Sequence, residues 1–315
     1  MNRNQQILAV VLAIQIILGI IVFWPKPAGI DEGESFFPGL QAGDTVAVTI
    51  TDNEGKAITM RQLAGDWVLP EAGDYPAEAD KITPVLDKIV GLNTQRLVTR
   101  TDASHERLQV AVDDFMRRVD LETTDGAKHA LYVGSSPQYG ANHVRVGGRD
   151  ETYLTDDLTA WELSVTATSW VDSTYLDIEE DRLTQVILEN VNGTFDFTRE
   201  DGGDWVLDGL AAGEQLSADR VSSVISKVSS VILMEPLGQQ KLAEYGLDNP
   251  QAIVTLVTAD QTVTLLIGAQ DPGDKSYVVH ASTSPYYVSV SEYNAQPLVE
   301  NTRIDFLESE ATPTP

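Results

Sequence analysis

The chain has 315 residues and a formal net charge of −27, from 48 acidic and 21 basic side chains. This length allows two domains of ordinary size, each with a core of its own. The charge would repel a phosphate backbone and no cluster of lysine and arginine offsets it locally, which argues against a nucleic-acid partner. Because the chain has no cysteine, disulfides, thiolate nucleophiles and zinc–sulfur sites are excluded.

Residues 7–24 form an apolar run that only Gln15 and Gly19 interrupt. A helix of this length extends ~27 Å, enough to cross the hydrocarbon core, and Trp24 stands where an interfacial aromatic residue is expected. We therefore predict an uncleaved, single-pass anchor in the cell membrane, with residues 1–6 in the cytoplasm and the bulk of the chain extracytoplasmic. The alternative is a cleaved signal peptide, but the run is long for one and no small-residue cleavage site follows it.

Residues 25–44 combine prolines, glycines and acidic residues without a hydrophobic period, which indicates a linker. Folded structure is predicted directly after it, with a strand hairpin over residues 46–60 and a third strand at Trp67. Residues 77–92 then have the apolar period of an amphipathic helix, which must cover the sheet. Meander strands follow, and a closing helix is expected over residues 157–163.

The pattern restarts after residues 174–180, which mark the predicted domain boundary. Asn192-Gly193 is a strong signal for a tight hairpin, and Ser217 is a suitable N-cap for a second amphipathic helix. A short helix is expected to end at Gly246, ahead of a long strand pair. A helix over residues 294–300 would mirror the closing helix of the first half.

One segment of the chain therefore occurs twice. Gly65-Asp66-Trp67-Val68-Leu69 and Gly203-Asp204-Trp205-Val206-Leu207 each precede an amphipathic helix, a polar connection and paired strands. The sequence predicts an α+β fold, in which the transmembrane helix is followed by two tandem repeats of an antiparallel-sheet-plus-helix module. The repeats are assigned to residues 45–178 and 179–308, and a disordered tail to residues 309–315.

The second repeat carries the junction Tyr245-Gly246-Leu247-Asp248-Asn249-Pro250 and a strand that ends Leu266-Ile267-Gly268. With the anchor and the repeated tryptophan strand, these features resemble the family catalogued as domain of unknown function 4340. The first repeat departs from the pattern, because Arg107-Leu108-Gln109-Val110 stands at the junction and no proline follows. The resemblance implies an envelope protein encoded beside an ABC transporter of the gliding-motility or polysaccharide-export type. It implies no catalytic residues.

The four histidines, His105, His129, His143 and His280, lack the spacing that a metal site on one element requires. No glycine-rich loop matches a phosphate-binding loop either, so neither a metal nor a cofactor is predicted.

Ser135 and Ser136 follow Gly134 at a strand end, and His143 and Asp150 lie close in sequence, which raises the alternative of an envelope hydrolase. The nucleophile-elbow pattern Gly-x-Ser-x-Gly is absent, so a turn is the preferred interpretation.

Aromatic residues offer a further alternative. Trp67 and Trp205 lie in apolar strands and are predicted to pack in the core, although exposed indoles would instead indicate a carbohydrate-binding module. Tyr277, Tyr286 and Tyr287 are predicted to contribute to an interaction surface. Neighbours on a strand face opposite sides, so one of the adjacent pair should be buried.

The sequence thus favours a non-enzymatic, membrane-tethered binding or scaffold protein outside the cytoplasm. We expect a protein partner, with components of an ABC transporter or an envelope complex as the leading candidates. The hydrolase with Ser135 or Ser136 and the carbohydrate-binding module remain the alternatives.

Overall fold

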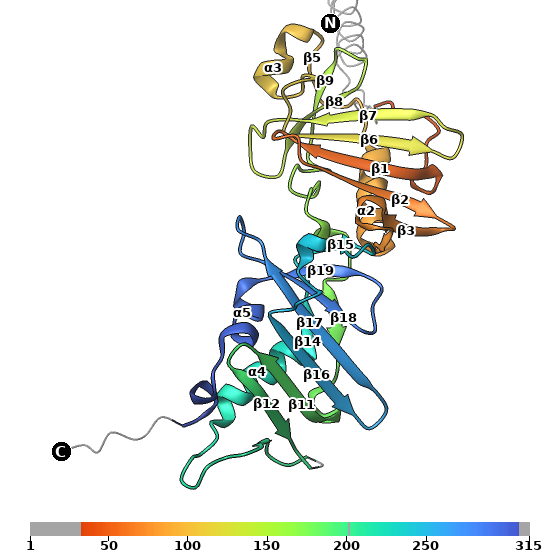
Figure 1. The fold of residues 1–315 in the computed structure, drawn as a ribbon. Helices are drawn as coiled ribbons and strands as arrows, with labels where there is room; N and C mark the ends of the chain where they lie inside the picture. The colour runs from red at the N-terminus through yellow and green to blue at the C-terminus, as the bar shows by residue number, and fades with distance from the viewer. Residues whose placement is uncertain (1–32, 201, 309–315) are drawn as a thin grey trace, which may run out of the picture.

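The computed structural model describes residues 33–200 and 202–308, which form two sheet-based modules joined end to end (Figure 1). The sheets have nine and eight strands, all paired antiparallel, and helices pack against them, so the sheet-rich α+β prediction is confirmed. The predicted anchor at residues 7–24, the segment 1–6 and the tail 309–315 lie outside the described residues. Within the described part of the chain, no helix combines the length and apolar character needed to cross a membrane.

The first module contains α2 (Ala79–Gly91), the short α3 (His105–Leu108) and a sheet in the order β4-β3-β2-β1-β6-β7-β8-β9-β5. Its strands are β1 (Thr45–Asp52), β2 (Ala57–Leu63), β3 (Asp66–Leu69), β4 (Tyr75–Pro76), β5 (Leu97–Thr99), β6 (Arg117–Thr123), β7 (Lys128–Val133), β8 (Asn142–Val146) and β9 (Thr152–Thr155).

The second module contains α4 (Ala218–Ser229), α5 (Glu292–Glu300) and a sheet in the order β13-β12-β11-β16-β17-β18-β19-β15. Its strands are β11 (Leu183–Asn190), β12 (Gly193–Thr198), β13 (Val206–Leu207), β15 (Glu235–Gly238), β16 (Ala252–Thr258), β17 (Thr262–Gln270), β18 (Tyr277–Ala281) and β19 (Tyr287–Val290). A separate two-stranded sheet pairs β10 (Thr174–Asp177), at the predicted domain boundary, with β14 (Ser230–Ile232).

The two large sheets have the same topology, apart from the extra strand β4 at the edge of the first. Strands β3-β2-β1-β6-β7-β8-β9-β5 correspond in order to β13-β12-β11-β16-β17-β18-β19-β15. The correspondence extends to register, because the pairing of β1 with β6 shifts between Thr45 and Ala47, and that of β11 with β16 shifts between Leu183 and Gln185. Such bulges bend and twist a strand, so both sheets are shaped at the same place.

The two amphipathic helices form where the apolar period predicts them. α2 buries Ile82, Leu86 and Ile89 against the first sheet, and α4 buries Val221, Val224, Ile225 and Val228 against the second. Ser217 occupies the N-cap position of α4, although its side chain makes no capping hydrogen bond.

The expected helix at residues 157–163 is wrong, whereas α5 forms close to the range expected for its counterpart. Between Leu158 and Leu163 the chain makes only a turn, with backbone hydrogen bonds from Glu162 to Thr159 at 3.2 Å and from Leu163 to Ala160 at 3.3 Å. The Glu162 carboxylate accepts hydrogen bonds from the backbone N–H and the hydroxyl of Thr159, at 3.0 and 2.9 Å, as at the start of a helix, but the turn does not continue into one.

The predicted linker also needs correction, because its last part belongs to the first module. Phe36 and Phe37 are buried, and the Phe36 ring lies 5.1 Å from that of Tyr153. The Phe36 N–H donates to the carbonyl of Leu92 at 2.9 Å. Two adjacent phenylalanines remove enough apolar area from water to hold residues 33–35 against the chain that follows α2.

The modules meet in a packed joint. Gly73 approaches the backbone of the second module so closely that a Cβ there would lie 3.0 Å from the amide nitrogen of Gln239. The Gln239 side chain donates to the Gly73 carbonyl at 3.0 Å, and the Tyr286 hydroxyl donates to the carbonyl of Asp74 at 2.9 Å. One hydrophobic cluster runs through both modules, which therefore share a core at the joint.

Replacement of Tyr286 by phenylalanine is expected to lower the free energy of unfolding by about 0.5–1 kcal/mol, because it removes this single hydrogen bond and keeps the ring. Urea unfolding of the full chain measures the effect. Tyr293→Phe is the matched control, since Tyr293 lies 78% exposed and its hydroxyl has no partner among the described residues. Equal stability of the two variants would contradict a role for the bond at the joint.

Candidate functional site

A cleft of about 920 Å³ lies beside the end of β7 in the first module. Side chains from four separate segments line it, among them Gln109, Arg117, Ser135, Ser136, Tyr139 and Trp161. Of these residues, the sequence pattern points to the two serines as candidates and to Gln109 only as part of the divergent junction.

Gly134 sets the position of the cleft wall. A Cβ on this residue would lie 2.1 Å from the carbonyl oxygen of Leu108, so only glycine lets α3 reach the sheet here. The Ser135 N–H then donates to the same carbonyl at 2.9 Å, and the Asn142 side chain donates to the carbonyl of Gly134 at 2.8 Å. Gly268 has the same relation to the second module, where a Cβ would lie 2.0 Å from the carbonyl oxygen of Tyr245.

Gln109 occupies the position that corresponds to Gly246. Both residues follow a short helix and adopt the left-handed conformation, with φ of 54° and 67°. This conformation is open to glycine but costs a residue with a side chain roughly 1 kcal/mol. The first module thus keeps the backbone of the Tyr-Gly-Leu junction and adds a side chain, which lines the cleft.

Ser135 and His143 are close, but their hydrogen bonds do not activate the serine. The His143 Nδ1 atom lies 2.9 Å from the Ser135 carbonyl oxygen, which can only accept, so Nδ1 carries the proton. The Ser135 hydroxyl lies 3.1 Å both from Nδ1 and from the carbonyl of Leu108, and it donates to that carbonyl. A nucleophilic serine must instead donate to an unprotonated base.

His143 has the surroundings of a buried, neutral imidazole, without an acidic partner among the described residues. Burial lowers the pKa of His143, the hydrogen bond to the Ser135 carbonyl opposes this shift, and the positive charge of Arg107 adds to it. No carboxylate hydrogen-bonds to His143 within residues 33–200 and 202–308, so a third member of a catalytic triad is not in place there.

Ser136 acts as a turn residue, as the sequence predicts. Its hydroxyl contacts the carbonyls of Gln138 at 2.6 Å and Ala141 at 2.7 Å, which closes the loop that carries Tyr139. Tyr139 is fully exposed and Trp161 is 92% exposed. The sequence analysis proposes neither aromatic residue as a site. At Tyr139 the available signal is an aromatic residue among turn-forming neighbours, whereas Trp161 lies in the segment predicted to be a helix.

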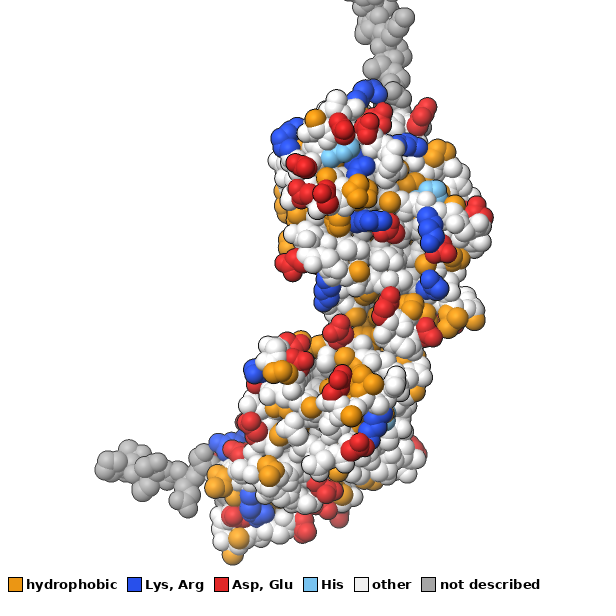
Figure 2. Space-filling view, turned by 45° about the horizontal axis from the view of Figure 1, so that its top comes forward, with side chains coloured by type: hydrophobic (Ala, Val, Ile, Leu, Met, Phe, Trp, Pro, Cys, Tyr) orange, Lys and Arg blue, Asp and Glu red, His pale blue; other side chains and the backbone are white. Residues whose placement is uncertain are grey.

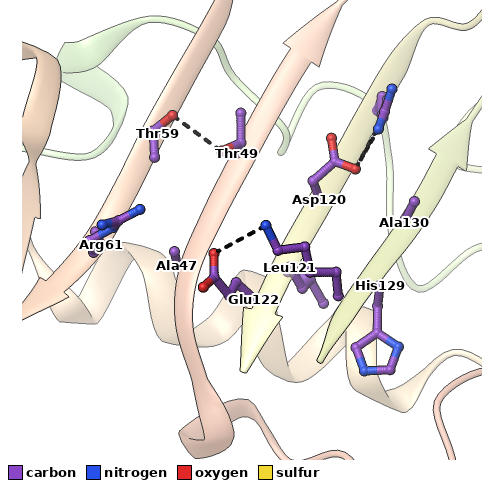
Figure 3. A pocket seen from close by; sticks show the side chains of 11 residues that line it. Ala47, Thr49, Thr59, Arg61, Asp120, Leu121, Glu122, His129 and Ala130 are labelled. Carbon is purple, nitrogen blue, oxygen red and sulfur yellow. Dashed lines mark hydrogen bonds and ion pairs between the residues drawn. The ribbon is translucent and has the colours of Figure 1, made fainter. Parts of the chain in front are cut away.

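The outward face of the first sheet forms a second, smaller depression of about 470 Å³ (Figure 3). Thr49 and Thr59 join their hydroxyls across β1 and β2 at 3.1 Å, and Arg118 pairs with Asp120 on β6 at 2.8 Å. This face points away from α2, because successive residues of a strand face opposite sides. The corresponding face of the second sheet carries half-buried Ile253 and Leu266, which are paired across β16 and β17.

The three tyrosines predicted to form an interaction surface are not gathered on one exposed face. Tyr277 is 3% exposed, and the Tyr287 ring stacks on that of His280 at 4.5 Å. Tyr286 packs within the joint, 4.7 Å from the ring of Tyr75. Burial raises the pKa of Tyr75 to about 12, with further contributions from Tyr175, Asp172 and Tyr286, so its hydroxyl stays protonated.

The histidines are dispersed across the fold. The His105 Nε2 atom lies 2.9 Å from the carbonyl oxygen of Asp150, and the His129 ring contacts Phe37 at 5.4 Å. Within the described ranges, no three histidine or acidic side chains are grouped so that they could hold a metal ion.

Comparison with known proteins identifies the family. A family model described as a domain of unknown function (DUF4340) matches residues 67–237 and 232–311, which together cover more than half of the chain. The chain belongs to the DUF4340 family. The DUF4340 matches run from Trp67 through the joint and the whole second sheet, and they take in Gly134, Trp161 and Gly268. No curated protein matches the chain, and no solved structure does.

Proposed function

We propose that this DUF4340 protein is a membrane-tethered extracytoplasmic scaffold, in which two duplicated modules follow a single transmembrane helix and bind a protein partner. Its partner is a component of an ABC transporter in the envelope. The apolar run at residues 7–24 supports the tether. The transporter context rests only on what the family resemblance implies, since the matching family model is described as a domain of unknown function.

The observation that carries the proposal is that two sheets share one core and each presents a sheet face that points away from its helix. Figure 1 shows the modules arranged end to end, so these faces extend along a long body. The joint between Tyr286 and the carbonyl of Asp74 supports a fixed arrangement. A scaffold needs extended surface of this kind, whereas a catalyst needs convergent polar groups of suitable protonation in a pocket.

The outward faces of the two sheets differ in chemistry, so the first suits charged contacts with a partner and the second suits apolar contacts. The first carries ion pairs, with Arg118 beside Asp120 and Lys128 3.9 Å from Glu122 (Figure 3). The second carries β-branched and aliphatic side chains such as Ile253 and Leu266. Charged contacts contribute mainly to orientation and association rate, and buried apolar contacts mainly to affinity.

Photo-crosslinking in membranes tests the proposal. A photoreactive residue at Thr49 or Ile253, on the two sheet faces, is expected to capture a transporter component that mass spectrometry identifies. A photoreactive residue at Asp87, exposed on α2 on the opposite side of the first sheet, is the matched control. Replacement of residues 1–24 by a cleavable signal peptide should reduce capture, because tethering supplies the effective concentration.

Capture of a transporter component from Asp87 as efficiently as from the sheet faces would contradict the assignment of the binding surface. Failure of both sheet-face positions to capture any transporter component would contradict the transporter role itself.

A further inference from the structure

The cleft beside β7 has a distinctive set of exposed aromatic side chains. Among residues 33–200 and 202–308, three aromatic residues are largely exposed, namely Tyr139, Trp161 and Tyr293, and two of these three line the cleft. An exposed indole leaves a large apolar face in water, so its placement at a cleft calls for a ligand that covers it.

The segment that carries Trp161 is held in place before any ligand arrives. Thr159 hydrogen-bonds twice to the Glu162 carboxylate, which also forms an ion pair with Lys88 of α2. The preceding Leu158 and the following Leu163 are fully buried. A flat aromatic face on an anchored turn can bind a ligand without a large cost in ordering.

Charge limits the ligand further. Acidic side chains outnumber basic ones by more than two to one in the sequence, and Figure 2 shows them scattered over both modules. The cleft nevertheless has no carboxylate in its lining, and its one charged residue is Arg117. The Arg117 guanidinium donates to the carbonyls of Leu163 at 2.8 Å and Met116 at 2.7 Å, so it is engaged within the protein. Without a carboxylate the lining has nothing to pair with a cationic ligand, and the net charge of −27 repels an anionic one, so a neutral ligand is favoured.

Hydrogen-bonding groups complete the site. No described residue hydrogen-bonds to the side-chain amide of Gln109, which keeps two donors and an acceptor for a ligand. The equivalent residue in the second module is Gly246, where a Cβ would lie 3.1 Å from the amide nitrogen of Ala269. Ala269 in turn stands where the first module has Ser135. The first module alone therefore places an amide and a hydroxyl at this point, at the cost of a left-handed glutamine, and such strain is typical of functional sites.

We propose that this cleft binds a neutral oligosaccharide, with sugar rings stacked on Trp161 and Tyr139 and hydroxyl groups bonded to Gln109. A sugar ring combines an apolar face of C–H groups with an edge of hydroxyls, and it carries no charge. That combination fits a cleft with aromatic walls, an uncommitted amide and no carboxylate among its described lining residues. The proposal goes beyond the scaffold role and does not depend on it.

Calorimetric titration of the full chain tests the proposal, with β-1,4-linked tetrasaccharides of glucose and of N-acetylglucosamine as probes. The chain is kept in a detergent without a sugar headgroup, since an alkyl glycoside would compete for the cleft. We expect one tetrasaccharide to bind with a dissociation constant of roughly 1 mM or below. Trp161→Ala and Tyr139→Ala should each weaken binding about tenfold or more, as loss of an aromatic contact residue does.

Three variants separate a ligand contact from a structural effect. Tyr293→Ala, the matched control, removes the third exposed aromatic residue from the other module and should leave binding unchanged. Gln109→Gly should weaken binding and at the same time raise the midpoint of thermal unfolding, because it relieves the left-handed side chain. Trp161→Ala should leave that midpoint unchanged, since the indole is exposed.

Absence of binding of either tetrasaccharide at about 10 mM, or binding that persists in Trp161→Ala, would overturn the proposal. Acetyl-pentaalanine amide serves as a peptide probe, and its binding in place of both sugars would reassign the cleft to an extended protein segment. Crosslinking to a transporter component is measured separately, so failure of the oligosaccharide site and failure of the scaffold role are distinguishable.

Discussion

Substitution of Gly268 by alanine is expected to destabilise the second module by about 3 kcal/mol or more. The new Cβ would lie 2.0 Å from the carbonyl oxygen of Tyr245 and 2.9 Å from Cδ2 of Leu247. The Tyr245 carbonyl belongs to the backbone and cannot move aside as a flexible side chain can. The end of β17 and the junction that begins at Tyr245 must therefore separate. Gly134→Ala should have the same effect on the first module, where Leu108 supplies the obstructing carbonyl.

Urea unfolding, followed by tryptophan fluorescence, measures these losses. Gly91→Ala is the matched control, because Gly91 ends α2 with no atom within 4 Å of its added Cβ and with no left-handed backbone. Alanine is the better helix former by about 0.5–1 kcal/mol, so this control should be neutral or slightly stabilising. If all three variants unfold at one urea concentration, the close approach at Gly134 and Gly268 is not a constraint on folding.

Truncation of Trp67 to alanine should cost about 3–5 kcal/mol, since the indole is 6% exposed and packs in the core beneath α2. The equivalent Trp205→Ala should cost only about 1–2 kcal/mol. Trp205 is half-buried, precedes β13 instead of lying within it, and has the Arg199 guanidinium 4.7 Å above its ring.

Unfolding midpoints of the two single variants, compared with the unsubstituted chain, measure this asymmetry. The repeated sequence predicts equivalent burial for the two tryptophans, so the half-buried position of Trp205 is a departure from that expectation. An equal loss of unfolding free energy in the two variants would contradict the difference in burial between Trp67 and Trp205.

Much of the architecture follows from local pattern. The apolar period at Ile82, Leu86 and Ile89 suffices to predict α2. The repeated tryptophan segment predicts a second module like the first, and the two sheets indeed have the same strand order. Patterns of this kind are visible because one face of each element is buried. The burial of Phe36 and Phe37 is not predictable from the sequence, because two apolar residues among polar and glycine-rich neighbours form no period. Their partners Leu92 and Tyr153 are also distant in sequence.

The candidate site was predictable only in part. Ser135 and His143 are indeed neighbours, yet which atom holds the proton depends on the carbonyls of Ser135 and Leu108, which no sequence motif encodes. Tyr139 resembles an ordinary loop residue in the sequence, and Trp161 lies in the segment that was expected to be a helix. The exposure of both side chains is decided by the tertiary surroundings of their turns. The role of Gln109 becomes clear only by comparison with Gly246. The shared topology places the two left-handed residues at equivalent positions of the two modules.

Tyr286 makes its described contacts within the chain. Tyr286 is predicted to contribute to an interaction surface, and in the structure its ring packs against Tyr75 of the same chain. Tyr175 reinforces this arrangement, because its hydroxyl donates to the Tyr286 carbonyl at 2.6 Å and accepts from the Ala281 N–H at 2.9 Å.

The joint holds the two modules at a fixed angle to each other. Gly73 and Gly238 let the two backbones touch, and the shared core leaves no hinge between the modules. When Ser35 at the start of the described chain is held, the position of the second module is fixed as well, because the two modules share one core. Reach then depends on the attachment of the first module and not on bending, so inserting residues before Ser35 would lengthen reach without changing the angle between the modules.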